Sequence, residues 1–405
     1  MSSTLAIEGG APLRVRPYPA WPQWDEREEA AIQETLRSGQ WWAPGGSQVK
    51  RFEQEFAAYH DARYAVAVTN GSAALEVCLR AARVDWGDEV ITTPYTFIAT
   101  ANACLLVGAI PRFVDLLPDT WNMNPAQVEA AITPRTRAII AVHIGGEPAD
   151  MDSLGEIARR HGLLLIEDAC QAHGAIWQGR KVGAIGDVGC FSFQASKNIT
   201  GGEGGMILTN DEGWAERCWS VGNVGRQRHG EWYQHIALAS NYRLSEWAGA
   251  VLRAQLSRME GQAERRSHNA AYLADALSEV KGIAPLVGDP RVTRNAYHLF
   301  KMWYQPECFG GRTSREFAAA MQAEGIPIGA GYLEPLSRTQ VVVERTRFIG
   351  EKLGLPSLPA PDCPVAEAAC ARGLWLLQSV LLAEQGDLDD IVRAALKVQY
   401  AWQST

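Results

Sequence analysis

The 405-residue sequence lacks the features that would place the protein in a membrane or an export pathway. It contains no run of about 18 apolar residues, which a bilayer-spanning helix requires. Its first residues lack the apolar core of a signal peptide. The eight cysteines are scattered, with no CxxC pair and no compact group of cysteine and histidine. We therefore expect a cytoplasmic protein with reduced thiols, no membrane contact and no bound metal.

An excess of positive charge is also missing. The 38 lysines and arginines are outnumbered by 46 aspartates and glutamates, which gives a net charge of −8. Because a nucleic-acid-binding protein needs a basic surface, we expect no nucleic-acid partner. The sequence has no GxxxxGK[ST] motif, no GxGxxG after its first strand and no HExxH. These absences exclude a Walker-type nucleotide site and argue against dinucleotide and zinc-hydrolase sites.

Strand and helix patterns alternate between residues 60 and 210. Short apolar, β-rich segments are separated by segments with helical periodicity. Such an alternation predicts an α/β fold with a mostly parallel sheet covered by helices on both faces. The seven expected strands are residues 64–69, 89–93, 110–114, 137–142, 163–167, 190–193 and 206–208, and the expected helices between them are residues 72–83, 98–107, 125–132 and 151–160.

The pattern changes in the last third of the sequence. Residues 244–277 form one long, polar-rich helical segment, which is typical of a helix that bridges two parts of a structure. Beyond residue 285 we expect a strand at 298–304 and helices at 314–324 and 387–400. We predict an N-terminal arm and large domain over residues 1–260 and a smaller α+β domain over residues 261–405.

The first candidate site follows the first expected strand. Gly71 permits a tight turn, and a helix then opens at Ser72 and Ala73. The first N–H groups of a helix have no internal partner, and the helix dipole is positive at that end, so this turn can hold a phosphate. An ordinary helix capped by Ser72 fits the same pattern.

Two ionisable side chains follow later strands. Asp168 ends a hydrophobic strand, where a carboxylate can bind Mg²⁺, act as a base, pair with a protonated ring nitrogen or cap a turn. Its neighbour His173 fits a structural or a functional role equally well. Lys197 lies between a strand and a glycine-rich turn at 201–205. If it is buried there, its amine has a lowered pKa and is nucleophilic, whereas most lysines are simply exposed.

These three features together suit one cofactor. Pyridoxal 5′-phosphate needs an anchor for its phosphate, an amine for its aldehyde and an anion for its ring nitrogen. A carboxylate keeps that nitrogen protonated by charge attraction, so that the ring can accept electrons. The sequence therefore predicts a pyridoxal phosphate site with Lys197 and Asp168 as its catalytic residues and Gly71 in the phosphate turn.

Four longer motifs, PYTFIATANA, EDACQAHGA, FSFQASKNITGGEGG and NYRLSEWAGA, occur in this order. They resemble those of the DegT/DnrJ/EryC1/StrS family of sugar aminotransferases, which have the fold type I architecture of aspartate aminotransferase. The resemblance covers nearly the whole chain. It implies that Lys197 forms a covalent imine with the cofactor and that Asp168 pairs with the ring nitrogen.

The same resemblance implies the remaining contacts with the cofactor. Gln171 would approach the ring hydroxyl, and Phe97 would stack on the ring, at a position where some family members carry tryptophan. Asn241 would reach the phosphate in the neighbouring subunit of a homodimer. Ser72, Ala73 and Ser192 would hold the phosphate within the subunit.

The reaction implied is a ping-pong transfer of an amino group from glutamate or glutamine to the ketone of a sugar or cyclitol. The WPQW and SGQWWAPGG segments and residues 374–382 resemble a narrower subset, the scyllo-inosose aminotransferases and 3-amino-5-hydroxybenzoate synthases. This subset acts on six-membered carbocycles without an attached nucleotide. Arg226, Arg228 and His229 could instead grip a diphosphate, which would favour a nucleotide sugar.

Two other functions stay open at this point. One is an aromatising dehydration of the 3-amino-5-hydroxybenzoate synthase type, although the dehydratases of the family carry histidine where this chain has Lys197. The other is a non-catalytic sensor that binds pyridoxal phosphate or a keto sugar. A sensor would need an additional binding module, and the first 60 residues are too few for a DNA-binding domain.

Overall fold

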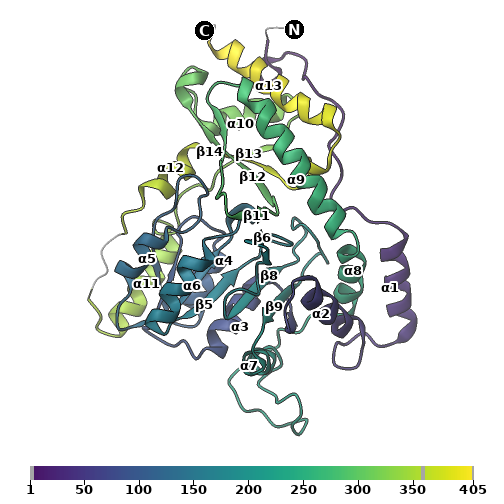
Figure 1. The fold of residues 1–405 in the computed structure, drawn as a ribbon, viewed down its shortest axis with the longest axis vertical. Helices are drawn as coiled ribbons and strands as arrows, with labels where there is room; N and C mark the ends of the chain where they lie inside the picture. The colour runs from purple at the N-terminus through teal and green to yellow at the C-terminus, as the bar shows by residue number, and fades with distance from the viewer. Residues whose placement is uncertain (1–3, 357–360, 404–405) are drawn as a thin grey trace.

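A computed structural model describes residues 4–356 and 361–403. The two larger of its β-sheets, of seven and four strands, lie one above the other along the long axis of the molecule (Figure 1), and a third sheet has three short strands. The first described residues and the last helix lie beside the smaller sheet, where Leu5 is part of its hydrophobic core. The chain thus starts at the smaller sheet, builds the larger one and returns.

The larger sheet has the seven strands that the sequence predicts. Its strand order is β1-β9-β8-β5-β4-β2-β3, and β9 alone runs antiparallel to its neighbours. The predicted mostly parallel sheet is therefore confirmed. The strands are β1 (Tyr64–Val68), β2 (Glu89–Thr92), β3 (Ile110–Phe113), β4 (Thr136–Val142), β5 (Leu164–Asp168), β8 (Val188–Ser192) and β9 (Gly205–Thr209).

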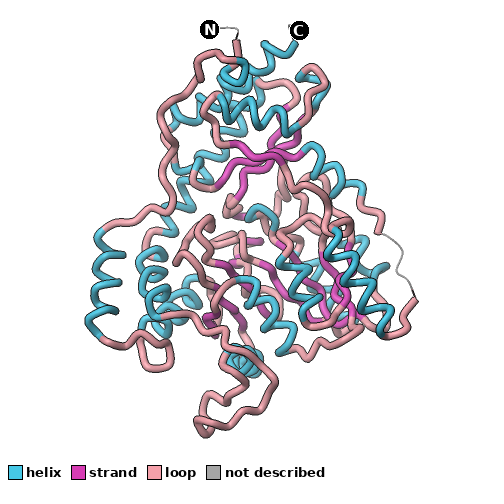
Figure 2. The backbone as a smooth tube through the Cα atoms, turned by 180° about the vertical axis from the view of Figure 1, so that it is seen from behind, coloured by secondary structure: helices cyan, strands magenta, loops and turns pink. Residues whose placement is uncertain are grey.

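Helices cover both faces of this sheet, as Figure 2 shows from behind. Successive residues of a strand point to opposite faces, so Ile139 and Ile140 of β4 belong to two different hydrophobic clusters. Both side chains are fully buried, which explains the uninterrupted apolar pattern of the strands. The predicted helices are confirmed as α3 (Gly71–Ala81), α4 (Ala99–Leu106), α5 (Pro125–Ala131) and α6 (Met151–His161), and α7 (Glu212–Gly222) follows β9.

The smaller sheet is antiparallel and has its own core. Its order is β10-β12-β14-β13, with β10 (Ile283–Pro285), β12 (Leu299–Tyr304), β14 (Gly373–Leu377) and β13 (Ile328–Ala330). The predicted strand at 298–304 is β12, and the predicted helices are α10 (Ser314–Ala323) and α13 (Gln385–Gln403). The division of the chain into residues 1–260 and 261–405 stays a prediction.

The single long helix expected at 244–277 is wrong. The structure has two helices there, α8 (Glu246–Leu256) and α9 (Met259–Ala276), separated at Ser257 and Arg258. The Ser257 hydroxyl donates to the backbone oxygen of Ala254 at 2.6 Å, a local bond that competes with regular helix geometry.

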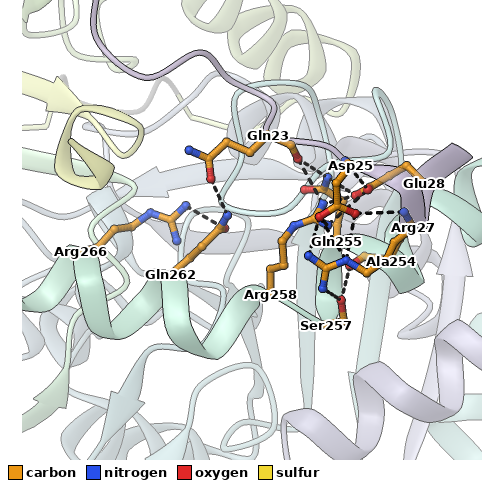
Figure 3. A network of polar contacts seen from close by, with 10 residues as sticks. All are labelled: Gln23, Asp25, Arg27, Glu28, Ala254, Gln255, Ser257, Arg258, Gln262 and Arg266. Carbon is orange, nitrogen blue, oxygen red and sulfur yellow. Dashed lines mark hydrogen bonds and ion pairs between the residues drawn. The ribbon is translucent and has the colours of Figure 1, made fainter. Parts of the chain in front are cut away.

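The break between α8 and α9 anchors the N-terminal arm (Figure 3). Gln255 donates to the backbone oxygen of Gln23 at 2.8 Å and to Glu28 at 2.7 Å. Arg258 forms ion pairs with Asp25, at 3.2 Å, and with Glu28. These contacts hold the start of α1 (Glu26–Ser38) against the larger sheet's outer helices.

The sequence analysis did not predict the remaining elements. They comprise α1 and further helices, short strands and 3₁₀ turns in both parts of the chain. They are α2 (Gln48–Tyr59), β6 (Ile176–Trp177), β7 (Arg180–Lys181), β11 (Val292–Arg294), α11 (Gln340–Lys352), α12 (Pro364–Arg372) and the 3₁₀ turns at Ala6–Glu8, Ile144–Gly146, Leu277–Glu279, Pro306–Phe309 and Val380–Leu382. Within residues 4–356 and 361–403, no helix combines the length and apolarity needed to cross a bilayer.

We predict that Asp115 stabilises α12 from 250 residues away. Its buried carboxylate accepts hydrogen bonds from the backbone N–H groups of Val365 and Ala366, both at 2.9 Å, in the first turn of α12. The side chain of the cap residue of α12, Cys363, makes no capping hydrogen bond. The variant Asp115→Ala should lower the free energy of unfolding by about 2 kcal/mol, because two N–H groups in the first turn of the helix lose their acceptor. Asp115→Asn keeps one acceptor oxygen and should lose about half as much. Urea unfolding measures both, and a wild-type midpoint for the alanine variant would contradict this role.

Candidate active site

The two residues predicted to be catalytic lie at the same edge of the larger sheet. Asp168 is the last residue of β5, and β8, the adjacent parallel strand, ends at Ser192, five residues before Lys197. Parallel neighbours deliver their carboxyl ends to one edge, where ligands of such sheets bind. The structure therefore brings Lys197 and Asp168 together from segments 29 residues apart in the sequence.

Lys197 is half-buried, and its amine lies on the buried side of the residue. Burial lowers the pKa of Lys197, and the nearby Cys170 and Asp168 oppose part of this shift. The loop that carries Lys197 is held on its other side by the N-terminal arm, because the Trp21 indole donates to the backbone oxygen of Ala195 at 2.9 Å. An amine whose pKa is lowered by burial has a larger neutral fraction, and the neutral amine can attack a carbonyl carbon.

Asp168 is 6% exposed and has a fixed orientation. The Thr100 hydroxyl, on α4, donates to its Oδ2 atom at 2.8 Å, and the backbone N–H of Cys170 donates to Oδ1 at 3.3 Å. Thr100 is not marked as a site residue by the sequence. The residue stands inside the PYTFIATANA motif, but only the folded structure shows that it contacts Asp168.

The predicted phosphate turn lies at the start of α3. A side chain on Gly71 would come within 2.7 Å of the Ser192 Cβ and 2.8 Å of the Cys170 Sγ, so only glycine lets α3 approach the end of β8 this closely. The helix is capped by Asn70, whose side chain accepts from the Ala73 N–H at 2.8 Å. The alternative in which Ser72 caps the helix is therefore wrong. The Ser72 side chain is exposed at the turn.

Gln171 lies beside the same edge with its amide oriented by the backbone. Its Oε1 atom accepts from the Gly145 N–H at 2.7 Å, and its side chain also hydrogen-bonds Tyr332. Burial raises the pKa of Tyr332 to about 12. Tyr332 packs edge-on against Tyr95 and Trp375, with ring centroids 5.0 and 5.2 Å apart. Tyr332 was not identified from the sequence, because it comes from a loop 161 residues beyond Gln171.

His173 has a structural contact. Its Nε2 atom and the backbone oxygen of Ser192 are 2.8 Å apart, and the ring packs against Phe191 and Phe193. Burial lowers the pKa of His173 well below its usual value, so the neutral ring donates from Nε2 to the carbonyl. The histidine thereby fixes the backbone of Ser192, one of the residues predicted at the phosphate.

Two predicted cofactor contacts lie on the surface of the subunit. Phe97 is 57% exposed just before α4, and Asn241 is exposed opposite Asn223 in an isolated β-bridge. The stacking role of Phe97 and the reach of Asn241 into a neighbouring subunit stay predictions.

The basic loop after α7 already has partners within the chain. The Arg226 guanidinium lies 4.1 Å from the Trp232 ring centroid, and Arg228 pairs with Glu216 at 2.9 Å. His229 is exposed. Contact of this loop with a substrate stays a prediction.

The residues at this edge fit the groups of pyridoxal phosphate. A buried amine, an oriented carboxylate, a close-packed helix N-terminus and an amide side chain meet there. In the part of the chain that the structure describes, no three His, Cys, Asp and Glu side chains are grouped so that they could hold a metal ion. The amine, the carboxylate and the helix N-terminus match the three anchors that pyridoxal phosphate needs.

We predict that Lys197 titrates at lower pH than the surface lysines of the cofactor-free protein. Burial disfavours its charged form, and the Asp168→Asn variant should lower its pKa further because it removes a negative charge that opposes this shift. Reductive methylation with ¹³C-formaldehyde followed by NMR titration measures each amine, and Lys197→Arg identifies the resonance. A Lys197 signal that titrates together with the surface lysines in both proteins would contradict the burial argument.

Comparison with known proteins agrees with this geometry. The model of the DegT/DnrJ/EryC1/StrS aminotransferase family matches residues 22–395. The chain is 38% identical to an L-glutamine:2-deoxy-scyllo-inosose aminotransferase of Streptoalloteichus tenebrarius, over 97% of each chain, and 38% identical to a 3-amino-5-hydroxybenzoate synthase of Amycolatopsis mediterranei, over 92% of this chain and 94% of the relative. A crystal structure of 3-amino-5-hydroxybenzoic acid synthase superposes with a TM-score of 0.87, at 36% identity over 98% of this chain and all of that one. The predicted resemblance and fold are thus confirmed, and the chain belongs to the DegT/DnrJ/EryC1/StrS aminotransferase family.

Proposed function

We propose that this aminotransferase holds pyridoxal phosphate on Lys197 and transfers an amino group from glutamine or glutamate to the ketone of a cyclitol. The observation that carries the proposal is the buried Lys197 amine at the strand edge where Asp168 ends β5. Pyridoxal phosphate supplies, when bound, an electrophilic carbon and a ring that accepts an electron pair.

Lys197 has two tasks in this proposal. Its amine would attach the cofactor, and its Nζ atom, once free, would accept the proton from the donor α-carbon and return it to the cofactor carbon that receives the amino group. Burial lowers the pKa of Lys197 and so increases the neutral fraction that can accept this proton. The contact of Trp21 with the Ala195 carbonyl holds the loop in place while the side chain moves.

Asp168 would pair with the protonated ring nitrogen. Because Thr100 and the Cys170 N–H hold its two oxygens, the carboxylate is oriented before the cofactor binds. Gln171 would donate to the ring hydroxyl. Phe97 would stack on the ring, and the turn at Gly71, Ser72 and Ala73 with Ser192 would hold the phosphate.

Two observations support a free cyclitol over a nucleotide sugar as the acceptor. The Arg228 guanidinium, a candidate ligand for a diphosphate, is already paired with Glu216. Relatives that match nearly the full chain carry names in which glutamine is the donor and an inosose the acceptor. An aromatising reaction is the second candidate, favoured by the TM-score of 0.87 with 3-amino-5-hydroxybenzoic acid synthase.

We further propose that the active unit is a homodimer in which Asn241 reaches the phosphate in the partner subunit. Asn241 is exposed at the end of the loop that follows α7, which extends away from the body of the subunit (Figure 1). A role for Asn241 outside its own subunit is consistent with this exposure.

We predict that the two half-reactions can be followed by the colour of the protein. The protein loaded with pyridoxal phosphate should absorb at about 400–430 nm, as expected for a Schiff base, and glutamine should bleach this band. After removal of glutamine, 2-deoxy-scyllo-inosose or scyllo-inosose should restore the band. Lys197→Ala should show neither the band nor turnover.

A panel of acceptors separates the alternatives. Recovery of the band with a nucleotide keto sugar and not with either inosose would contradict the cyclitol assignment. Formation of a product with aromatic absorbance would identify the second candidate. A wild-type protein that shows no visible band and no response to glutamine would contradict the whole proposal.

We predict that Thr100 contributes to cofactor affinity through Asp168. The variant Thr100→Val removes the hydroxyl that donates to Asp168 Oδ2 and should weaken binding of pyridoxal phosphate about tenfold, since one hydrogen bond to a carboxylate is worth about 1.5 kcal/mol. Thr100→Ser keeps the donor and should bind like the wild type. Equilibrium dialysis measures both affinities, and equal affinities for valine and threonine would refute the role of Thr100.

A further inference from the structure

Lys301 is a buried cation that none of the predicted roles uses. It lies on β12 of the smaller sheet and is 4% exposed. Its Nζ atom has three acceptors, the backbone oxygens of Thr120 at 2.5 Å and Ile144 at 3.0 Å and the Glu147 carboxylate at 3.2 Å. An ammonium group has three N–H bonds, so the charged form of the side chain satisfies all three acceptors.

Two opposing effects act on the pKa of Lys301. Burial lowers its pKa, and the neighbouring Glu147 opposes the shift. Glu147 is itself buried and also accepts from the backbone N–H of Asp289 at 3.1 Å. A buried ion pair of this kind adds little net stability, so its presence is better explained by what it orients.

The Lys301 ammonium contacts one end of a single peptide group. The carbonyl of Ile144 accepts from Lys301, and the N–H of the same planar unit, which belongs to Gly145, donates to the Gln171 Oε1 atom at 2.7 Å. The positive charge therefore lies at the oxygen end of the peptide dipole, and Gln171 lies at the hydrogen end. Hydrogen bonds arranged head to tail in this way polarise and strengthen one another.

Gly145 fits closely against the lysine stem. Its φ angle is +69°, and a Cβ atom at this position would lie 2.8 Å from the Lys301 Cδ. The left-handed backbone and the lack of a side chain allow the Ile144–Gly145 peptide group to lie between Lys301 and Gln171. Lys301 thus fixes this peptide group both by hydrogen bonding and by packing.

The orientation of the Gln171 amide follows from this contact. Since the Gly145 N–H is a donor, the amide oxygen must face it, and the NH₂ group faces the opposite way, toward Tyr332. One N–H of that group can donate to the Tyr332 hydroxyl, and the other is left for a second acceptor.

We infer that Lys301 is a positioning residue for the cofactor, which acts through the Ile144–Gly145 peptide group to orient and polarise the Gln171 amide toward the ring oxygen of pyridoxal phosphate. The inference rests on the proposed function. It links β12 of the smaller sheet to a group that would touch the cofactor at the edge of the larger sheet.

The inference predicts a direction for the acid–base behaviour of the bound cofactor. The ring oxygen of the cofactor carries most negative charge after the group that absorbs visible light has lost its proton. A hydrogen-bond donor at that oxygen stabilises this charge. Weakening this donor should therefore raise the pH midpoint of the visible absorbance change. Replacing Gln171 by leucine should raise the midpoint by about one pH unit, because one unit corresponds to about 1.4 kcal/mol, the worth of a hydrogen bond to a charged group.

The test variant is the double substitution Lys301→Met with Glu147→Gln, which removes both charges of the buried pair. We expect its midpoint to rise by about half a pH unit, in the same direction as that of Gln171→Leu, because methionine has no N–H donor and no charge to fix or polarise the peptide group. Hydrogen exchange of the peptide that contains Gly145 should become faster in the cofactor-bound protein. Lys301→Gln with Glu147→Gln, which keeps an N–H donor without either charge, should shift the midpoint less and provides the measurement if the methionine variant does not fold.

The matched control is Met302→Ala. Met302 is the next residue of β12 and is buried in the core of the smaller sheet. Because successive residues of a strand point to opposite faces, its truncation should destabilise the sheet without disturbing the peptide group. Its midpoint should equal that of the wild type. A wild-type midpoint in the lysine variants together with a shifted one in Gln171→Leu would overturn the inference. Absence of any visible band in the wild type would instead refute the proposed function.

Discussion

A lysine amine buried beside a strand-end carboxylate is the interaction on which the rest of this active site depends. Two adjacent parallel strands, β5 and β8, end at the same edge, and this topology brings Asp168 and Lys197 together without any local sequence contact. Burial lowers the pKa of Lys197, which makes the amine reactive, and the carboxylate limits that shift. The surrounding contacts of Thr100, Trp21 and His173 all hold one of these two segments in place.

The sequence predicts the larger sheet well because its strands are uninterrupted apolar segments and its helices are periodic. The site residues at strand ends, such as Lys197 and Asp168, follow from the same reasoning. The break at Ser257 was missed because a helical pattern continues on both sides of a single serine–backbone bond. Asn70 and Ser72 are equally good caps by residue type, and only the coordinates show which one bonds the helix.

Residues that act from a distance could not be predicted. Thr100 and Tyr332 contact Asp168 and Gln171 across 68 and 161 positions of the sequence, and nothing in their local patterns marks them. Lys301 stands within the apolar strand HLFKMWY, where a lysine suggests an exposed edge rather than a buried cation. Its contacts show that the smaller sheet also shapes the chemistry of the site, because the ammonium group bonds a loop that follows β4 of the larger sheet.

The most direct test of the account is to locate the covalent attachment of the cofactor. Borohydride reduction of the protein loaded with pyridoxal phosphate fixes any imine as a stable amine, and mass spectrometry of the digested protein then identifies the labelled residue. The account predicts one phosphopyridoxyl group per chain, on Lys197. A label on another lysine, or no stoichiometric label at all, would contradict it.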